Sequence, residues 1–181
     1  MGFQIVDGTG NGTVAEVNKD NQLATMSVIE TEFEFVSKKR GLSFSWSSGT
    51  YDAAANDTIL LIKNTSSNYN LHIDGIWLST DTETRVVIHV PTTEVTPTGT
   101  SVTGTNLNIN SSNVAEATAI RDETNNTQGN IVWSGEIQAT GEPFFIDLAG
   151  ALILGTNDSI GVDYVADVAA CDVTIAGHFQ V

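Results

Sequence analysis

Apolar and polar residues alternate with a period of two along most of this chain, which is the pattern of β-strands with one buried face. Residues 32–36 and 42–46 show it most clearly, with phenylalanine, leucine or tryptophan at every second position. Residues 58–63 form a continuous apolar run instead, as expected of a central strand covered on both faces. Further strands are predicted at residues 14–17, 22–28, 71–78, 85–90, 130–137, 142–148, 151–155, 159–165 and 171–179.

Turn-forming residues separate these segments at the spacing of a β-sandwich or barrel. Helix signals are nearly absent. Residues 113–120 could form a helical turn, with Asn113 and Glu116 at capping-box spacing, and a strand is equally compatible there. We therefore predict an all-β fold: one single-domain antiparallel β-sandwich, jelly-roll-like, with about ten strands over residues 13–181. A flexible glycine-rich segment is expected at residues 1–12.

The pattern changes after Pro91. Residues 91–113 are rich in Thr, Asn, Gly and Pro, with few large apolar side chains, and are too long for an ordinary hairpin loop. Two interpretations stay open: this excursion lies on a neighbouring molecule, or it returns the chain from one sheet to the other.

Charge limits the classes of partner. The 181 residues hold 7 Lys and Arg against 22 Asp and Glu, a formal net charge of −15. Such a surface repels nucleic acid and anionic membranes, so neither is an expected partner. No run approaches the ~20 apolar residues of a membrane span, and residues 1–12 do not resemble a secretory signal.

Candidate chemistry is sparse, and we predict neither an enzyme nor a resident cofactor. His72 and His89 alternate with apolar neighbours, which directs them away from the core, and with His178 they show no zinc-ligand spacing. The single cysteine, Cys171, lies in an apolar run and is interpreted as a small buried hydrophobe. Asn56–Asp57, Asn125–Asn126 and Asn157–Asp158 offer oxygen ligands without the twelve-residue calcium pattern, so only adventitious Ca²⁺ stays open.

One basic cluster stands out in this acidic chain. Lys38, Lys39 and Arg40 hold three of its seven positive charges, in a predicted turn between two strands. A solvated turn and a contact with an acidic neighbour explain it equally well.

The excursion carries a family resemblance. Residues 98–108, TGTSVTGTNLN, followed by residues 111–118, SSNVAEAT, resemble a stretch of small virion proteins of tailed bacteriophages. Residues 59–64, 71–76 and 152–160 are similar to the flanks of that stretch, and residues 12–17 with 22–23 are similar to the start of such proteins. The resemblance implies a capsid decoration or cement protein, made in the host cytoplasm and carried in the virion, which binds the major capsid protein and copies of itself, most simply as a trimer.

The sequence therefore favours a non-enzymatic virion protein, with assembly contacts expected at Lys38, Lys39, Arg40, Pro91, Thr98, Asn106 and Asn108. The alternative is a tail- or fibre-associated jelly-roll module that binds host-surface glycans, with Trp46, Trp77 or Trp133 as sugar platforms if exposed. Because each tryptophan has apolar partners on its own strand face, core packing is the simpler expectation. A polysaccharide hydrolase would need two carboxylates in one groove, and no sequence context marks such a pair.

Overall fold

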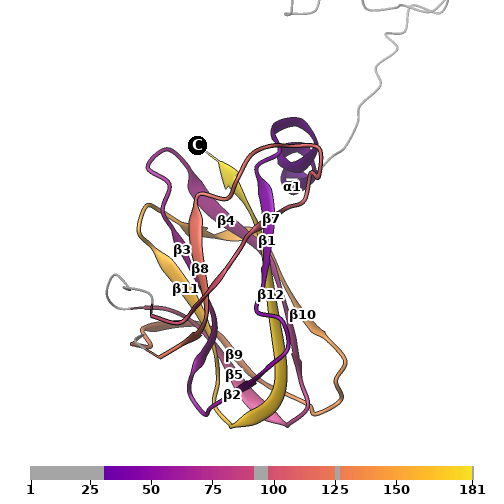
Figure 1. The fold of residues 1–181 in the computed structure, drawn as a ribbon, viewed down its shortest axis with the longest axis vertical. Coiled ribbons are helices and arrows are strands. Elements are labelled where there is room, and N and C mark those ends of the chain that lie inside the picture. The colour runs from indigo at the N-terminus through magenta and orange to yellow at the C-terminus, as the bar shows by residue number, and fades with distance from the viewer. Residues whose placement is uncertain (1–30, 92–97, 125–126, 181) are drawn as a thin grey trace, which may run out of the picture. The chain divides into compact units, whose positions relative to one another are not determined.

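The computed structural model describes residues 31–91, 98–124 and 127–180. From Glu32 onward these residues form two antiparallel β-sheets that enclose one apolar core, and Figure 1 shows the two layers. The predicted all-β sandwich is confirmed. The segment 1–12 and the predicted strands at 14–17 and 22–28 lie outside the described residues.

The first sheet has the strand order β10-β4-β12-β1-β7, with β2 also paired to β12. The second sheet has the order β6-β8-β3-β11-β5-β9. Every pairing within both sheets is antiparallel. The strands of the first sheet are β1 (Ser43–Ser47), β2 (Tyr51–Ala53), β4 (Asn70–Thr80), β7 (Thr105–Asn106), β10 (Phe144–Leu154) and β12 (Val168–Gln180). Those of the second are β3 (Thr58–Asn64), β5 (Thr84–Val90), β6 (Thr100–Val102), β8 (Ala117–Glu123), β9 (Asn130–Ile137) and β11 (Ser159–Tyr164).

The order of the longer strands is compatible with the predicted jelly roll. One sheet contains β1-β12-β4-β10 and the other contains β3-β11-β5-β9, the arrangement that two Greek keys produce. The described residues contain twelve strands, of which β2, β6 and β7 have only two or three residues. Residues 142–148 and 151–155, predicted as two strands, form the single strand β10, which is interrupted by a bulge with positive φ at Ala149 and Gly150.

Alternation along the strands builds the core. Phe44 and Trp46 point inward from β1 and are fully buried, while Ser45 between them points outward. On β3, Leu60 and Ile62 join the core, and Leu61 on the opposite face is also fully buried. The prediction of a central strand covered on both faces is therefore confirmed for β3.

One predicted strand is wrong. Residues 32–36 form helix α1 (Glu32–Phe35), which continues as one π-helical turn, η1 (Val36–Arg40). Four alternating residues are too few to distinguish a strand from a helical turn. Gly41 ends η1 in the left-handed conformation, with φ of 62°, a conformation that glycine adopts without steric cost. The basic cluster Lys38–Arg40 is therefore the end of a helix and not a turn between strands.

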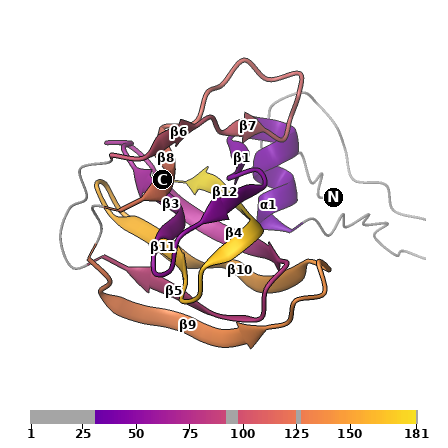
Figure 2. The ribbon, with the colours of Figure 1, turned by 60° about the horizontal axis from the view of Figure 1, so that its bottom comes forward.

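The described part of the excursion, residues 98–113, visits the first sheet and comes back to the second, because the strands before and after it, β5 and β8, both belong to the second sheet. The prediction that it carries the chain from one sheet to the other is therefore wrong. Its strand β6 pairs with β8 in the second sheet, and β7 pairs with β1 in the first, as Figure 2 shows. For residues 113–120 the sequence was compatible with a helical turn or a strand. The structure has no helix there, and strand β8 begins at Ala117. Residues 92–97 lie outside the described residues.

Candidate functional site

Asparagine side chains fasten the excursion to the end of η1. Asn106 Nδ2 donates to the carbonyls of Gly41 (2.9 Å) and Asn113 (3.0 Å). Asn108 Nδ2 donates to the carbonyl of Ser37 (3.1 Å), and Asn113 Nδ2 donates to that of Arg40 (3.0 Å). The bonds to the Arg40 and Gly41 carbonyls satisfy groups that a helix leaves unpaired at its end, so they fix the loop and the helix end together.

The loop held in this way presents apolar side chains to solvent. We name residues 107–114 the apolar loop. Within it Ile109 is 89% exposed, Val114 is 79% exposed and Leu107 is 41% exposed. Single exposed apolar residues are ordinary on protein surfaces, but three of them on a hydrogen-bonded loop form a fixed apolar surface. The sequence carried a signal for it, because Leu107 and Ile109 interrupt an Asn-rich segment.

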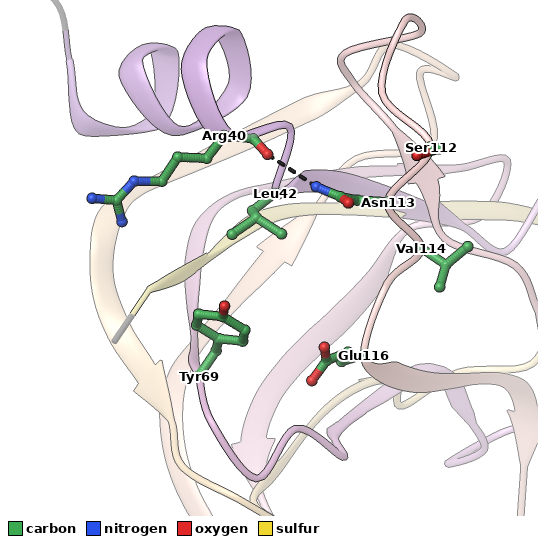
Figure 3. Close-up of a pocket in the computed structure, with 7 residues that line it drawn as sticks. All are labelled: Arg40, Leu42, Tyr69, Ser112, Asn113, Val114 and Glu116. Atoms are coloured by element: carbon green, nitrogen blue, oxygen red, sulfur yellow. Dashed lines mark hydrogen bonds between the residues drawn. The ribbon is translucent and has the colours of Figure 1, made fainter.

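An open groove lies beside the apolar loop. Figure 3 shows the side chains that line it, and its volume is about 790 Å³. Leu42 and Tyr69 supply apolar wall and pack against the core, while Arg40 and Glu116 bring opposite charges to its rim. The complete lining is Arg40, Leu42, Tyr69, Ser112, Asn113, Val114 and Glu116. The groove can therefore receive an apolar group with a polar surround.

The seven residues expected at assembly contacts do not lie in one place. Lys38, Lys39 and Arg40 lie at the end of η1, where their charges also favour the carboxyl-terminal end of the helix. Arg40 lies over the ring of Phe35, 5.7 Å from its centroid. Asn106 and Asn108 lie next to this end of η1, where their side chains bond to the carbonyls of Gly41 and Ser37.

Thr98 and Pro91 lie elsewhere. The backbone N–H and hydroxyl of Thr98 both donate to the buried carboxylate of Glu123, which anchors the start of the described excursion to β8. Pro91 directly follows β5 and is half-buried. Thr98, Asn106 and Asn108 therefore hold the chain's own fold, and a role in contacts with other molecules stays a prediction for them.

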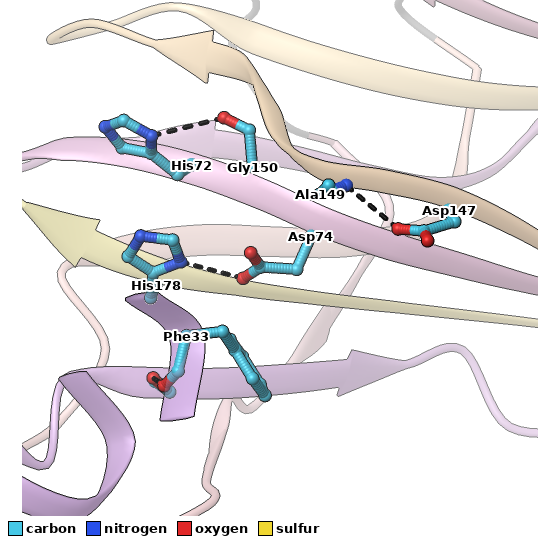
Figure 4. Close-up of polar contacts among 8 residues, drawn as sticks. Phe33, His72, Asp74, Asp147, Ala149, Gly150 and His178 are labelled. Atoms are coloured by element: carbon cyan, nitrogen blue, oxygen red, sulfur yellow. Dashed lines mark hydrogen bonds and ion pairs between the residues drawn. The ribbon is translucent and has the colours of Figure 1, made fainter. Parts of the chain in front are cut away.

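Two histidines stack on the outer face of the first sheet (Figure 4). His178 Nδ1 lies 2.8 Å from Asp74 Oδ2, and the His72 ring lies 5.0 Å from that of His178. The edge of the Phe33 ring covers His178, which is 2% exposed. Such a covered pair is a packed polar contact between the sheet and α1.

The third histidine lies on the outer face of the second sheet. His89 Nε2 lies 3.0 Å from Asp163 Oδ2, and the Thr58 hydroxyl donates to the same carboxylate at 2.7 Å. His72 is half-buried, whereas His89 is fully buried, so a position at the surface is not found for His89. Across the described ranges, no group of three or more His, Cys, Asp or Glu side chains could hold a metal ion.

The oxygen-rich loops predicted as Ca²⁺ ligands are separate turns. Asp158 accepts the N–H of Gly155 at 2.9 Å and thereby closes its own loop. Burial and the nearby carboxylates Asp122 and Asp163 raise the pKa of Asp57. Asn125–Asn126 lies outside the described residues. Adventitious Ca²⁺ stays a prediction.

The single cysteine is buried between the sheets, as its apolar context indicated. Burial raises the pKa of the Cys171 thiol to about 12, and burial likewise raises the pKa of Tyr51 and Tyr164 above the usual value for tyrosine. All three groups are therefore neutral in the folded protein at pH 7, and none is an activated nucleophile.

These raised pKa values predict alkaline destabilisation. The unfolded chain releases the Cys171 proton above pH of about 8.5, and tyrosine protons above about 10, while the folded chain keeps them. The free energy of unfolding should therefore be constant from pH 7 to 8 and should fall as pH rises from about 8.5 toward 12. Urea unfolding followed by circular dichroism measures the free energy of unfolding at each pH. Cys171→Ala should abolish the part of its fall that lies between about pH 8.5 and 10. A fall of equal size in that variant would contradict the assignment to Cys171.

No protein-family model, curated protein or solved structure matches this chain. None of the helices in the described residues has the length and apolar character needed to cross a membrane. The interpretation of function therefore depends on the surfaces described above.

Proposed function

We propose that this chain is a non-enzymatic structural protein that assembles with copies of itself. With the resemblance of residues 98–118 to tailed-phage virion proteins, we further propose a capsid decoration or cement protein. In this role the protein is synthesised in the host cytoplasm, becomes part of the virion, and binds the major capsid protein and its own copies as a trimer.

The apolar loop is the observation that carries this proposal. Ile109 and Val114 are held in solvent by a framework of asparagine hydrogen bonds, so presenting them costs little further ordering on assembly. Burying one such side chain against a partner contributes roughly 1.5 to 3 kcal/mol. A fixed apolar surface of this kind is typical of protein–protein contact sites.

The groove beside the loop is a candidate acceptor on the neighbouring copy. Leu42 and Tyr69 offer an apolar wall to a group such as Ile109, and Arg40 adds a positive charge near it. A loop of one copy in the groove of the next is a head-to-tail contact, which closes into a ring when the rotation per copy allows it. A three-fold rotation closes this contact into the proposed trimer, whereas a reciprocal exchange of loops would close a dimer.

Ile109→Asp tests the assembly role. Light scattering of the wild-type protein should show a stable oligomer, and the charge in the contact should weaken association at least about tenfold, which corresponds to 1.4 kcal/mol. Val165→Asp is the matched control, because Val165 is also an exposed apolar residue in a loop and should leave the oligomer intact. A wild-type monomer at high concentration, or two variants with the same mass as wild type, would contradict the proposal.

Cosedimentation with capsids tests the phage role separately. The wild-type protein should sediment with capsids that lack their decoration protein, and it should raise the temperature at which those capsids release their contents. An oligomer that binds no capsid would leave self-assembly in place and would overturn the decoration role.

The alternative function, recognition of host-surface glycans by a tail or fibre module, is favoured by the position of one tryptophan. Trp46 is fully buried in the core and Trp133 packs against it, which removes the first and disfavours the second as a sugar platform. Trp77 is 39% exposed on the outer face of the first sheet, so the expectation of core packing is wrong for it.

A further inference from the structure

A pair of aromatic rings stands on the outer face of the first sheet. Trp77 on β4 lies opposite Phe145 on β10 in the strand register, and the two rings stack with centroids 4.7 Å apart and an angle of 28° between their planes. Trp77 is 39% exposed and Phe145 is 47% exposed. The sheet therefore displays a stacked aromatic pair where hydrophilic side chains would ordinarily face water.

The backbone is shaped to hold this pair. The Phe145 ring lies over Gly75, where an added Cβ atom would come within 2.5 Å of the ring carbons. Glycine leaves the space that the Phe145 ring occupies, and the stacked Phe145 ring covers one face of the Trp77 ring, so each ring limits the motion of the other. An aromatic surface with so little freedom loses little entropy when a ligand stacks on it.

A small groove adjoins Trp77 on the side of β12. Its volume is about 170 Å³, and Asp172, Thr174 and Ser79 bring polar side chains to it. Trp77, Leu78 and Pro143 complete the lining. A groove of this size accommodates about one six-membered ring.

The carboxylate in the groove is oriented by the neighbouring strand. Asp172 Oδ1 accepts the hydroxyl of Ser47 at 3.2 Å and that of Ser48 at 3.5 Å. Both bonds go to one oxygen, so Oδ2 keeps acceptor capacity toward a ligand. Thr174 adds a hydroxyl that can donate or accept.

This combination matches the chemistry of a sugar ring. A pyranose has a face of C–H groups that packs on an aromatic ring and an edge of hydroxyls that require hydrogen-bond partners. We propose that the Trp77 ring and the groove with Asp172 and Thr174 bind one pyranose unit of a neutral oligosaccharide. This inference gives residues and a ligand class to the glycan alternative and is independent of self-assembly through the apolar loop.

Charge selects a neutral sugar over an acidic one. Asp172 lines the groove, and Glu142 lies next to the lining residue Pro143 in the chain. The whole chain has a formal charge of −15, which repels an anionic ligand before contact. Sialylated or sulfated glycans would place a second negative charge beside the Asp172 carboxylate without a compensating cation from the groove lining.

The extent of the surface argues against a protein partner at this place. A stable protein contact buries about 800 Å² on each partner, whereas two half-exposed rings with a groove for one sugar offer much less. The surface beside the rings is also polar, with Ser79, Asp172 and Thr174, whereas the centre of a protein–protein interface is depleted of charged residues.

An oligosaccharide array tests the proposal on the full-length protein. The array should present neutral hexose and N-acetylhexosamine oligosaccharides together with sialylated and sulfated ones. The protein should bind at least one neutral glycan and no acidic one. Binding to acidic glycans alone, or to no glycan, would overturn the proposal.

Calorimetric titration with the best neutral glycan then tests the residues. Trp77→Ala and Asp172→Asn should each lower affinity at least about tenfold, since each removes one of the two recognition elements. Phe144→Ala is the matched control. Phe144 is 45% exposed on β10, the strand of Phe145, and points to the opposite face of the sheet. The affinity of this variant should stay within twofold of the wild type. Unchanged affinity in Trp77→Ala would overturn the site.

Light scattering of Trp77→Ala separates this site from the assembly surface. The variant should keep the oligomeric state of the wild type, whereas Ile109→Asp should lose the oligomer and keep glycan affinity per chain. Dissociation of Trp77→Ala in the absence of sugar would identify this face as a protein contact and overturn the proposal.

Discussion

Replacing Trp46 with alanine is expected to lower the free energy of unfolding by about 3 to 5 kcal/mol, the range for deleting a large aromatic side chain from a core. Trp46 is fully buried on β1 and packs 6.1 Å from Phe44, ring centroid to ring centroid. Trp46 belongs to the core cluster between the sheets, so its deletion leaves a buried cavity. Urea unfolding followed by far-ultraviolet circular dichroism measures the loss.

Trp46→Phe is the control for that change. The indole Nε1 is buried and has no hydrogen-bond partner among the described residues, so a phenyl ring loses volume but no bond. Its cost should be clearly smaller than that of alanine. A loss below about 1 kcal/mol in Trp46→Ala, the size of an average substitution, would contradict the central position of Trp46.

Asn64→Leu should destabilise the protein by about 3 kcal/mol, because it leaves buried backbone groups without partners. Asn64 is fully buried at the end of β3. Its Nδ2 donates to the carbonyls of Tyr69 and Leu154, each at 2.9 Å, and its Oδ1 accepts the N–H of Ser66 at 2.9 Å. One side chain thereby joins the turn after β3 to the end of β10 in the other sheet.

Asn68→Leu is the matched control in the same turn, because Asn68 is exposed. It should change the free energy of unfolding by less than about 0.5 kcal/mol. Similar losses in both variants would show that leucine disturbs the turn itself and would contradict the role assigned to the Asn64 hydrogen bonds.

The strands were predictable where a buried face repeats over several residues. Phe44 and Trp46 alternate with serine and enter the core, and the continuous apolar run around Leu60 marks a strand that is covered on both faces. The order of strands in the sheets was not predictable at this level. Alternation states which face of a strand is buried but not which strand it pairs with.

Helix α1 shows where alternation misleads. Phe33 and Phe35 are two residues apart, as in a strand, yet the segment is helical. The stronger signals lay further along, in the basic residues Lys38–Arg40 followed directly by Gly41, which is the composition of a helix end. The alternation covers only four residues, so it is weaker evidence for a strand than the composition of residues 38–41 is for a helix end.

The surfaces were less predictable than the core. Trp77 lies between Ile76 and Leu78, in an apolar stretch of its strand. A bulge in the pairing with β12 lies between Trp77 and His72, so the face of Trp77 cannot be counted from the start of the strand. Lys38–Arg40, Asn106 and Asn108 were expected at assembly contacts because of charge and composition. Their hydrogen bonds and the exposure of Ile109 depend on how the excursion folds back onto η1, which no local pattern encodes.

The position of β12 has a consequence for how the chain folds. β12 lies between β4 and β1 in the first sheet, and its pairing joins Ser43 to His178, residues at nearly opposite ends of the described chain. Pairing over such a sequence separation has a high entropic cost before any contact forms, and proteins dominated by it fold in milliseconds to seconds. During synthesis the edges of β1 and β4 that face β12 stay unpaired until β12 has been made, and such unpaired edges expose the nascent chain to aggregation.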